Sequence, residues 1–305
     1  MYDSVGLVVS APGALQTVPC YLDDVAEHYY NGVPAVTGHL GNLGVTVSAD
    51  RVKVSHSLAR WYLGNNGKSM TRRDVQHAVE ALSDTLHLPM DTATVTRLDV
   101  ATNLMMQHPV GVYLEHLGDM KGAKRLLQPD ALYYSTRGGC LTIYDKVKEQ
   151  RARSEPVPEI FQGRSVLRME RRYTKRVQHQ LGQEVTGASL YNEAFYTMAI
   201  DRWRDAYRSI TKIRQITLDF TTMTGKKQFY RLAALHLIES QGGQLEFLGK
   251  LSEAQKMGQL TSKQAYDLRQ AVDEVCKCTT DGLTTASPLI TELDRKVNEA
   301  VRYYR

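Results

Sequence analysis

The 305 residues include 42% hydrophobic and 23% charged side chains, an ordinary balance for a globular protein with one large core or two modest ones. The net charge of +5 is compatible with nucleic-acid binding but does not establish it. No stretch approaches the ~20 apolar residues of a membrane span, and the N-terminus lacks a signal-peptide pattern. We therefore expect a cytoplasmic protein that does not associate with a membrane.

The N-terminal part mixes predicted strands and helices. Residues 4–10 are strand-like, and residues 43–48 and 51–56 alternate as the two arms of a hairpin. Residues 57–67 predict a short helix that ends in a turn rich in glycine and asparagine. Residues 71–86 predict a second helix, because a threonine cap precedes a period of three to four apolar positions.

The central part continues this mixture. In chain order we predict a strand at 94–104, a helix at 109–117, a hairpin of strands at 131–136 and 140–146, a loop at 154–164 and a strand at 166–177. From residue 189 onward the spacing is helical throughout. We therefore predict an α+β fold, in which a central antiparallel sheet packs helices on one face and leaves a polar catalytic face open.

A change of character near residue 185 predicts two parts. Residues 1–185 would form the α+β catalytic domain, and residues 186–305 a helical region. The pattern of residues 242–272 is typical of a helix–turn–helix, with Gly258 in the turn, so this region could bind DNA or a partner. Packing helices with a solvated face explain the same pattern equally well.

The four cysteines do not have zinc-site spacing. Cys276 and Cys278 are separated by one residue, and no histidine lies near them at ligand spacing, while Cys20 and Cys140 are isolated. We predict incidental thiols in a reducing compartment.

Three predicted strands place ionisable groups on one face, because strand side chains alternate. These groups are Arg97, Asp99 and Asn103 in the first strand, Thr142, Tyr144 and Lys146 in the second, and Arg168, Glu170 and Arg172 in the third. The opposite faces are apolar. If the strands are neighbours, two carboxylates, a tyrosine and a lysine converge on one surface of the sheet.

This grouping suits chemistry on a phosphodiester. Asp99 and Glu170 offer oxygen ligands for Mg²⁺ or Mn²⁺, and a bound metal polarises a phosphate. Tyr144 would be the nucleophile, and Lys146 would favour its phenolate or protonate the leaving oxygen. The candidate DNA-binding residues are Arg97, Arg168, Arg172 and Lys148.

A solvated sheet face explains the same pattern without any chemistry, because opposite charges often pair across strands. Tyr144 is one of 17 tyrosines, and Tyr133 and Tyr134 lie on the adjacent predicted strand, so the residues alone leave the nucleophile open. His56 ends a predicted strand and could reach a metal or be structural.

Four short motifs, in order, resemble the rolling-circle replication initiators of filamentous phages, the gene II and gene X protein family. They are Ser57-Leu58 with Tyr62 and Gly64-Asn65-Asn66, then Arg97-Leu98-Asp99, Tyr144-Asp145-Lys146 and Arg168-Met169-Glu170. The chain is also similar, more distantly, to initiators of the Rep_trans type from rolling-circle plasmids. The resemblance covers about residues 40–185. The two-histidine metal motif of other rolling-circle nucleases is missing, as it is in the carboxylate-based branch.

The resemblance implies a metal-dependent enzyme that nicks one strand of origin DNA and rejoins it through a 5′-phosphotyrosine. By this similarity Tyr144 is the nucleophile, with Lys146 beside it, and Asp99 and Glu170 are metal ligands. Double-stranded origin DNA and the displaced single strand would be partners, together with a host helicase and polymerase. Two alternatives remain: a non-catalytic DNA-binding regulator of replication, and a conjugative relaxase or transposase with the same sheet chemistry.

Overall fold

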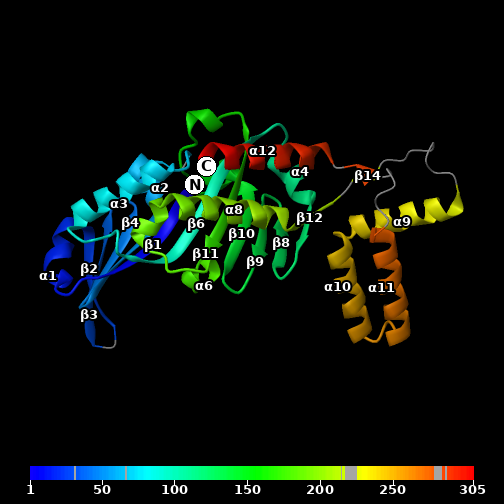
Figure 1. The fold of residues 1–305 in the computed structure, drawn as a ribbon, viewed down its shortest axis with the longest axis horizontal. Helices are drawn as coiled ribbons and strands as arrows, with labels where there is room; N and C mark the ends of the chain where they lie inside the picture. The colour runs from blue at the N-terminus through cyan, green and yellow to red at the C-terminus, as the bar shows by residue number, and fades with distance from the viewer. Residues whose placement is uncertain (31, 66, 214, 217–224, 278–283, 286) are drawn as a thin grey trace.

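The structure is a computed structural model that describes all residues except 31, 66, 214, 217–224, 278–283 and 286. Its centre is a ten-stranded antiparallel sheet (Figure 1). From edge to edge the strands are β2 (Asp23–Tyr30), β3 (Val33–Leu40), β4 (Leu43–Ser48), β5 (Arg51–Ser57), β1 (Tyr2–Ser10), β6 (Thr94–Met106), β11 (Ser165–Tyr173), β10 (Gly139–Asp145), β9 (Ala131–Ser135) and β8 (Lys124–Gln128). The predicted α+β class and the antiparallel sheet are confirmed.

Most helices cover one face of this sheet or continue beyond it, and one short helix packs on the other face. They are α1 (Ala14–Thr17), α2 (Leu58–Leu63), α3 (Arg72–Leu86), α4 (Val110–Glu115), α5 (Lys146–Ala152), α6 (Val177–Leu181), α7 (Gly187–Tyr191), α8 (Glu193–Arg208), α9 (Lys226–Ser240), α10 (Gln244–Lys256), α11 (Ser262–Lys277) and α12 (Pro288–Tyr304). Single 3₁₀ turns are η1 (Val18–Tyr21) and η2 (Glu159–Phe161). Two small two-stranded sheets pair β7 (Leu117–Met120) with β12 (Ile210–Lys212), and β13 (Gln215–Ile216) with β14 (Thr284–Thr285).

The apolar face of the sheet forms the main core under α3, α8 and α12. Leu98, Val100 and Met169 are fully buried in it, as the alternation in β6 and β11 predicts. In Figure 1, α8 crosses in front of these strands and α12 runs above it. The indole nitrogen of Trp203 on α8 donates to the carbonyl oxygen of Met169 at 3.1 Å, which fixes the helix on the sheet. Each large apolar side chain buried here contributes roughly 1.5–3 kcal/mol to folding.

Both predicted N-terminal helices are confirmed with their caps. The Ser57 hydroxyl accepts from the backbone nitrogen of Arg60 at 3.1 Å, and Gly64 ends α2 with a φ of 76°. At α3, Thr71 and Asp74 form a reciprocal capping box.

Several predicted boundaries in the middle of the chain are wrong. The helix predicted at 109–117 ends at Glu115, because Leu117 pairs with Lys212 of β12. The strand predicted to run to residue 177 ends at Tyr173, since Arg176 turns left-handed before α6. The helical spacing predicted from residue 189 is interrupted at Asn192, whose side chain caps α8. Cys20 and Cys140 form no disulfide, whereas Cys278 lies outside the described residues.

The C-terminal helices occupy two different places. α7, α8 and α12 share the main core with the sheet, whereas Ile238, Leu251 and Val272 join α9, α10 and α11 in a separate apolar cluster. In Figure 1, α10 and α11 run side by side as an antiparallel hairpin, away from the sheet. A DNA-reading helix–turn–helix has helices crossing at about 90–120°, so this arrangement does not favour one. The division at residue 185 stays a prediction.

Within the described part of the chain, no helix combines the length and apolarity needed to cross a bilayer.

Candidate active site

The three strands that carry the charged motifs are neighbours in the sheet, in the order β6, β11, β10. Asp99 pairs with Arg172, and Glu170 pairs with Thr142. Arg168 lies between Asn103 and Tyr144, so these three side chains form one row across the strands. Because directly paired residues point to the same face, the groups converge as the alternation in β6 and β11 predicts.

Most of these residues line a cleft of about 940 Å³ on the face of the sheet opposite the main core. Of the predicted site residues, the cleft is lined by Arg97, Asp99, Tyr144, Lys146, Lys148, Glu170 and Arg172. Arg168 is not exposed to it: only 2% of its side chain is accessible. The structure therefore places seven of the eight predicted residues around one cavity and the eighth beneath it.

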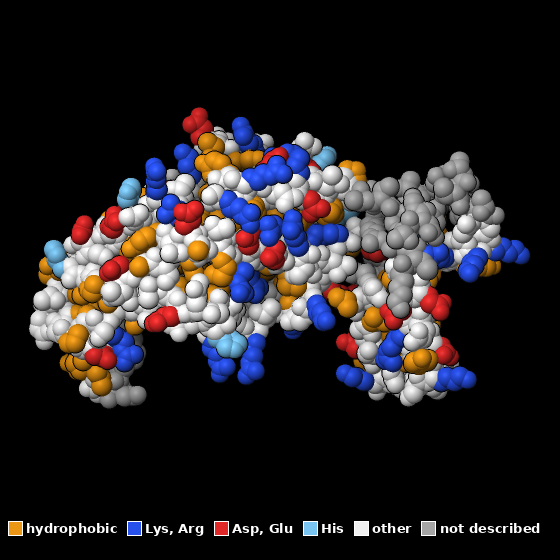
Figure 2. Space-filling model, viewed as in Figure 1, with side chains coloured by type: hydrophobic (Ala, Val, Ile, Leu, Met, Phe, Trp, Pro, Cys, Tyr) orange, Lys and Arg blue, Asp and Glu red, His pale blue; other side chains and the backbone are white. Residues whose placement is uncertain are grey.

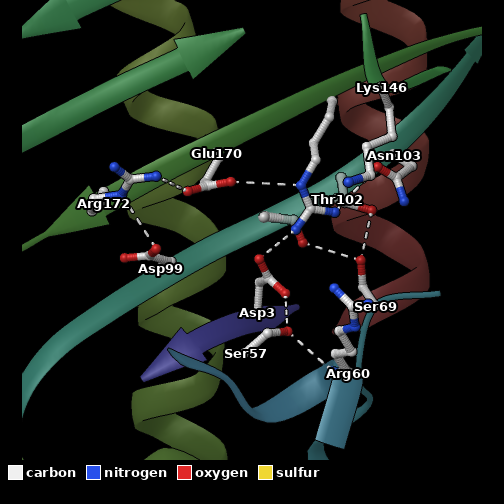
Figure 3. Close-up of polar contacts among 12 residues, drawn as sticks. Asp3, Ser57, Arg60, Ser69, Asp99, Thr102, Asn103, Lys146, Glu170 and Arg172 are labelled. Atoms are coloured by element: carbon white, nitrogen blue, oxygen red, sulfur yellow. Dashed lines mark hydrogen bonds and ion pairs between the residues drawn. The ribbon is translucent and has the colours of Figure 1, made fainter. Parts of the chain in front are cut away.

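Arg172 links the two candidate metal ligands. Its Nη2 lies 2.6 Å from an oxygen of Glu170, and its Nε lies 3.3 Å from an oxygen of Asp99 (Figure 3). Arg97 also donates to Asp99, with 3.0 Å between its Nε and Oδ1. Burial raises the pKa of Asp99 to about 6, a rise that the Arg97 hydrogen bond opposes and the Glu170 charge reinforces. The two carboxylates thus repel each other and are held together by guanidinium groups.

A second ion pair lies deeper and joins β11 to β1. Arg168 donates from Nη2 to Asp3 at 2.9 Å and from Nη1 to the side-chain oxygen of Asn103 at 3.2 Å. Asp3 also accepts from the hydroxyl of Ser57 at 2.7 Å. Burial raises the pKa of Asp3, but the Arg168 charge and the Ser57 hydrogen bond act against it, and the pKa is lowered overall. Figure 3 shows Asp3 between Ser57 and this network.

Tyr144 stands directly opposite Arg168 and is half-buried. Burial raises the pKa of its phenol above the ordinary value, and the Arg168 charge is the strongest influence that lowers it. Arg168, predicted to bind DNA, is therefore the cation that would favour the Tyr144 phenolate. Its burial and its contacts with Asp3 and Asn103 do not favour a contact with a DNA phosphate.

Lys146 lies in the cleft wall, but on a helix and not on the predicted strand. The strand ends at Asp145, and Lys146 begins α5, because the Asp145 carboxylate accepts from the backbone nitrogens of Val147 and Lys148. The prediction that strand alternation aligns Lys146 with Tyr144 is therefore wrong. Lys146 is nevertheless buried in the cleft wall, where its Nζ contacts Glu149 at 2.7 Å. Burial lowers its pKa, as does the nearby Arg168 charge.

One end of the polar face is covered, which explains why its charges are buried. Val147 of α5 and Phe161 of η2 pack on Val166 of β11 and form a small apolar cluster. Near this cover, the Asn103 side chain donates to the carbonyl oxygen of Gly67 at 3.0 Å. The face is thus open along the cleft and closed over Arg168.

The remaining candidate DNA-binding residues lie at the rim. The side chains of Arg97 and Arg172 are 36% and 39% exposed, and that of Lys148 is 58% exposed and pairs with Asp130. Each has nitrogen atoms that a phosphate could approach from the cleft.

The donor chemistry of Asp99 and Glu170 fits a hard divalent cation, since both offer carboxylate oxygens in one cavity. Both carboxylates are already in contact with arginine nitrogens. Among the described residues, no group of three or more His, Cys, Asp or Glu side chains is placed to hold a metal. A cation there would have to replace Arg172 and take its other ligands from water or phosphate.

Sequence reasoning missed Asp3, Ser57 as its partner, and Glu149. Asp3 is the one charged residue of a largely apolar strand, and that mismatch is the signal that could have identified it. Its pairing with Arg168 joins residues 165 positions apart in the chain, which no local pattern reveals.

Residues 1–194 match the family described as the N-terminal part of the phage replication-associated protein, the gene II protein. The chain belongs to this family. The match covers the whole sheet and extends to the first turn of α8, so every cleft residue lies inside it. It agrees with the resemblance of the four motifs to the filamentous-phage gene II replication initiators. A comparison with curated proteins finds no match.

Proposed function

We propose that this member of the phage replication-associated family initiates rolling-circle replication by nicking and rejoining one strand of origin DNA through Tyr144. The observation that carries the proposal is that Tyr144 lines one cleft with the carboxylates of Asp99 and Glu170, directly opposite the buried Arg168 on the neighbouring strand. A phenol, a cation that favours its anion, and rim arginines for phosphates together suit attack on a phosphodiester.

In the proposed step, the Tyr144 oxygen forms a bond to phosphorus while the bond from phosphorus to the 3′ oxygen breaks. Tyr144 loses its proton to solvent and becomes joined to the 5′ phosphate, and the 3′ oxygen gains a proton and leaves as a free hydroxyl. Lys146, whose pKa burial lowers, would supply that proton. Attack of a 3′ hydroxyl on the phosphotyrosine reverses these changes and rejoins the strand.

Asp99 and Glu170 would hold Mg²⁺ or Mn²⁺, and the bound ion would polarise the phosphate and offset its charge. Arg97 and Arg172 would then turn from the carboxylates to DNA phosphates. Lys148 would contact the backbone at the rim. Recruitment of a host helicase and polymerase stays a prediction.

The test is nicking of supercoiled DNA that carries the source replicon, with Mg²⁺ or Mn²⁺ present. The wild type should convert it to open circles, and chelation should stop the conversion. Tyr144→Phe should lose on the order of 10³-fold or more in rate, because it removes the nucleophile. Tyr133→Phe is the matched control, since Tyr133 lines the same cleft on β9, and it should keep most activity.

The contact of arginines with both carboxylates favours a second candidate, a DNA-binding regulator without chemistry. A wild type that binds the replicon tightly but does not nick it with either metal would support that candidate and contradict ours.

A further inference from the structure

A group of exposed cations lies beyond the open end of the cleft. Arg137 is in the turn between β9 and β10, and Lys175 and Arg176 follow β11. All three are exposed, and within the described chain no carboxylate lies at ion-pair distance from them. We call Arg137, Lys175 and Arg176 the basic knob. Figure 2 shows Lys and Arg side chains gathered at the lower edge of the molecule, below the position of α6 in Figure 1.

Backbone contacts hold the basic knob in a fixed shape. The carbonyl oxygen of Gly138 accepts from the backbone nitrogens of Thr174 and Lys175, at 3.0 and 3.2 Å. The Gln180 side-chain amide donates to the same oxygen at 3.0 Å and to the carbonyl of Lys175. These bonds tie the β9–β10 turn to the segment between β11 and α6, so the three cations are presented together.

Two features of the backbone show that this conformation restricts which residues can occupy it or costs free energy. A Cβ at position 139 would lie 1.8 Å from the carbonyl oxygen of Arg172, so only glycine permits this close approach of β10 and β11. Arg176 adopts a left-handed conformation with a φ of 49°, which is costly for a residue with a Cβ. Such strain persists where the surroundings impose it, and it is common at functional positions.

The basic knob continues the cationic side of the cleft. Tyr144, Thr142 and Cys140 line the cleft along β10, and Arg172 is paired with Cys140 at the end nearest the knob. Tyr144 lies six positions after Gly138, a distance of about 20 Å along an extended chain. One strand of DNA advances 3.4 Å per nucleotide in a duplex, so this span corresponds to about six nucleotides. Arg172 lies between, about 13 Å from Tyr144 by the same measure.

The opposite end of the cleft has a different charge pattern. There three cations in or next to α5 are already paired, Lys146 and Arg153 with Glu149 and Lys148 with Asp130, whereas Arg151 is exposed. A phosphate backbone that leaves Tyr144 toward the basic knob therefore meets three cations that no described carboxylate pairs.

We propose that the basic knob binds phosphates in one flank of the nicked DNA strand, about six nucleotides from the phosphate at Tyr144. The proposal rests on the proposed function, because Tyr144 defines the end of the path. The knob acts on affinity and on the length of DNA required, and not on the chemical step.

The test compares the wild type with the triple variant Arg137→Gln, Lys175→Gln, Arg176→Asn, in which asparagine tolerates the left-handed backbone. The matched control is Arg73→Gln, Lys121→Gln, Arg302→Gln, which removes the same charge from exposed positions elsewhere. Two labelled single strands centred on the mapped nick serve as probes, a 25-mer and one trimmed to three nucleotides on each side. Binding is measured across a series of salt concentrations.

The knob variant should bind the 25-mer at least tenfold more weakly than the control does. The slope of log affinity against log salt should fall by about two, because three phosphate contacts are lost on a single strand. Both variants should bind the trimmed strand equally and form adduct on it at the wild-type rate. Arg137→Gln alone, a single change in the turn, should show an intermediate loss on the 25-mer.

Equal binding of the 25-mer by knob and control variants would overturn the inference, as would an equal loss on the trimmed strand. If the wild type forms no adduct, the proposed function fails. The knob can then still be tested by its salt slope on a 25-mer of thymidine.

Discussion

The two faces of the central sheet bury their side chains by opposite means. On one face Leu98, Val100 and Met169 pack against helices, and their burial stabilises the fold directly. On the other, Asp99, Glu170 and Arg168 are almost as inaccessible, although burying charges costs free energy unless they are paired. The difference indicates that the polar face serves the function of the protein, whereas the apolar face serves its stability.

The largest effect on folding should come from breaking the deeper ion pair. Arg168→Met leaves Asp3 buried without its cation, and should lower the free energy of unfolding by about 3–5 kcal/mol. Urea denaturation measures this free energy. Arg172→Met is the control, and it should lower the free energy of unfolding less, because Arg172 is half-exposed whereas Arg168 is buried. Adding Asp3→Asn to Arg168→Met should recover part of the loss. No recovery would contradict the pairing.

On the apolar face, Leu98→Ala should lower the free energy of unfolding by about 2–5 kcal/mol, because it leaves a cavity under the helices. DNA binding by the folded protein should stay unchanged, since Leu98 points away from the cleft. Urea denaturation and a DNA titration check the two parts. Unchanged stability would contradict the burial of this face.

The pH dependence of stability should reveal Asp99. Its pKa of about 6 in the folded protein lies above the ordinary value of 3.8, so folding strengthens proton binding there. This stabilising contribution is complete below about pH 4 and is lost as the pH rises through 6. It amounts to about 2–3 kcal/mol, and Asp99→Asn should remove that slope. The charged groups around it are Arg97, Arg172 and Glu170. A slope of opposite sign would contradict the dominance of burial.

The smallest effect belongs to the rim. Lys148→Ala breaks an exposed pair with Asp130 and should change the free energy of unfolding by less than about 1 kcal/mol. Its effect on DNA affinity should exceed its effect on stability, and should decline as salt is added. A large loss of stability would show that this part of the cleft is structural.

Patterns that depend on near neighbours in the chain were predictable. Alternation identified β6 and β11 and assigned Asp99 and Glu170 to the correct face, and capping residues located α2 and α3. The end of β10 was missed because Asp145 caps a helix that the strand pattern concealed.

Long-range pairing was not predictable. The alternation of its strand predicts that Arg168 is a surface cation. It is buried because it pairs with Asp3 on β1 and because the cluster around Phe161 covers this end of the face. The same holds for the basic knob, which brings the β9–β10 turn to the segment after β11.

The central claim is that Tyr144 attacks DNA, and the most direct measurement is the search for its covalent adduct. Wild-type protein would be incubated with Mg²⁺ or Mn²⁺ and supercoiled DNA of the source replicon, then denatured, digested and analysed by peptide mass spectrometry. A nucleotide on the peptide that contains Tyr144, absent after chelation and in Tyr144→Phe, is the expected result. An adduct on Tyr133, or tight binding of the replicon without any adduct, would contradict the account.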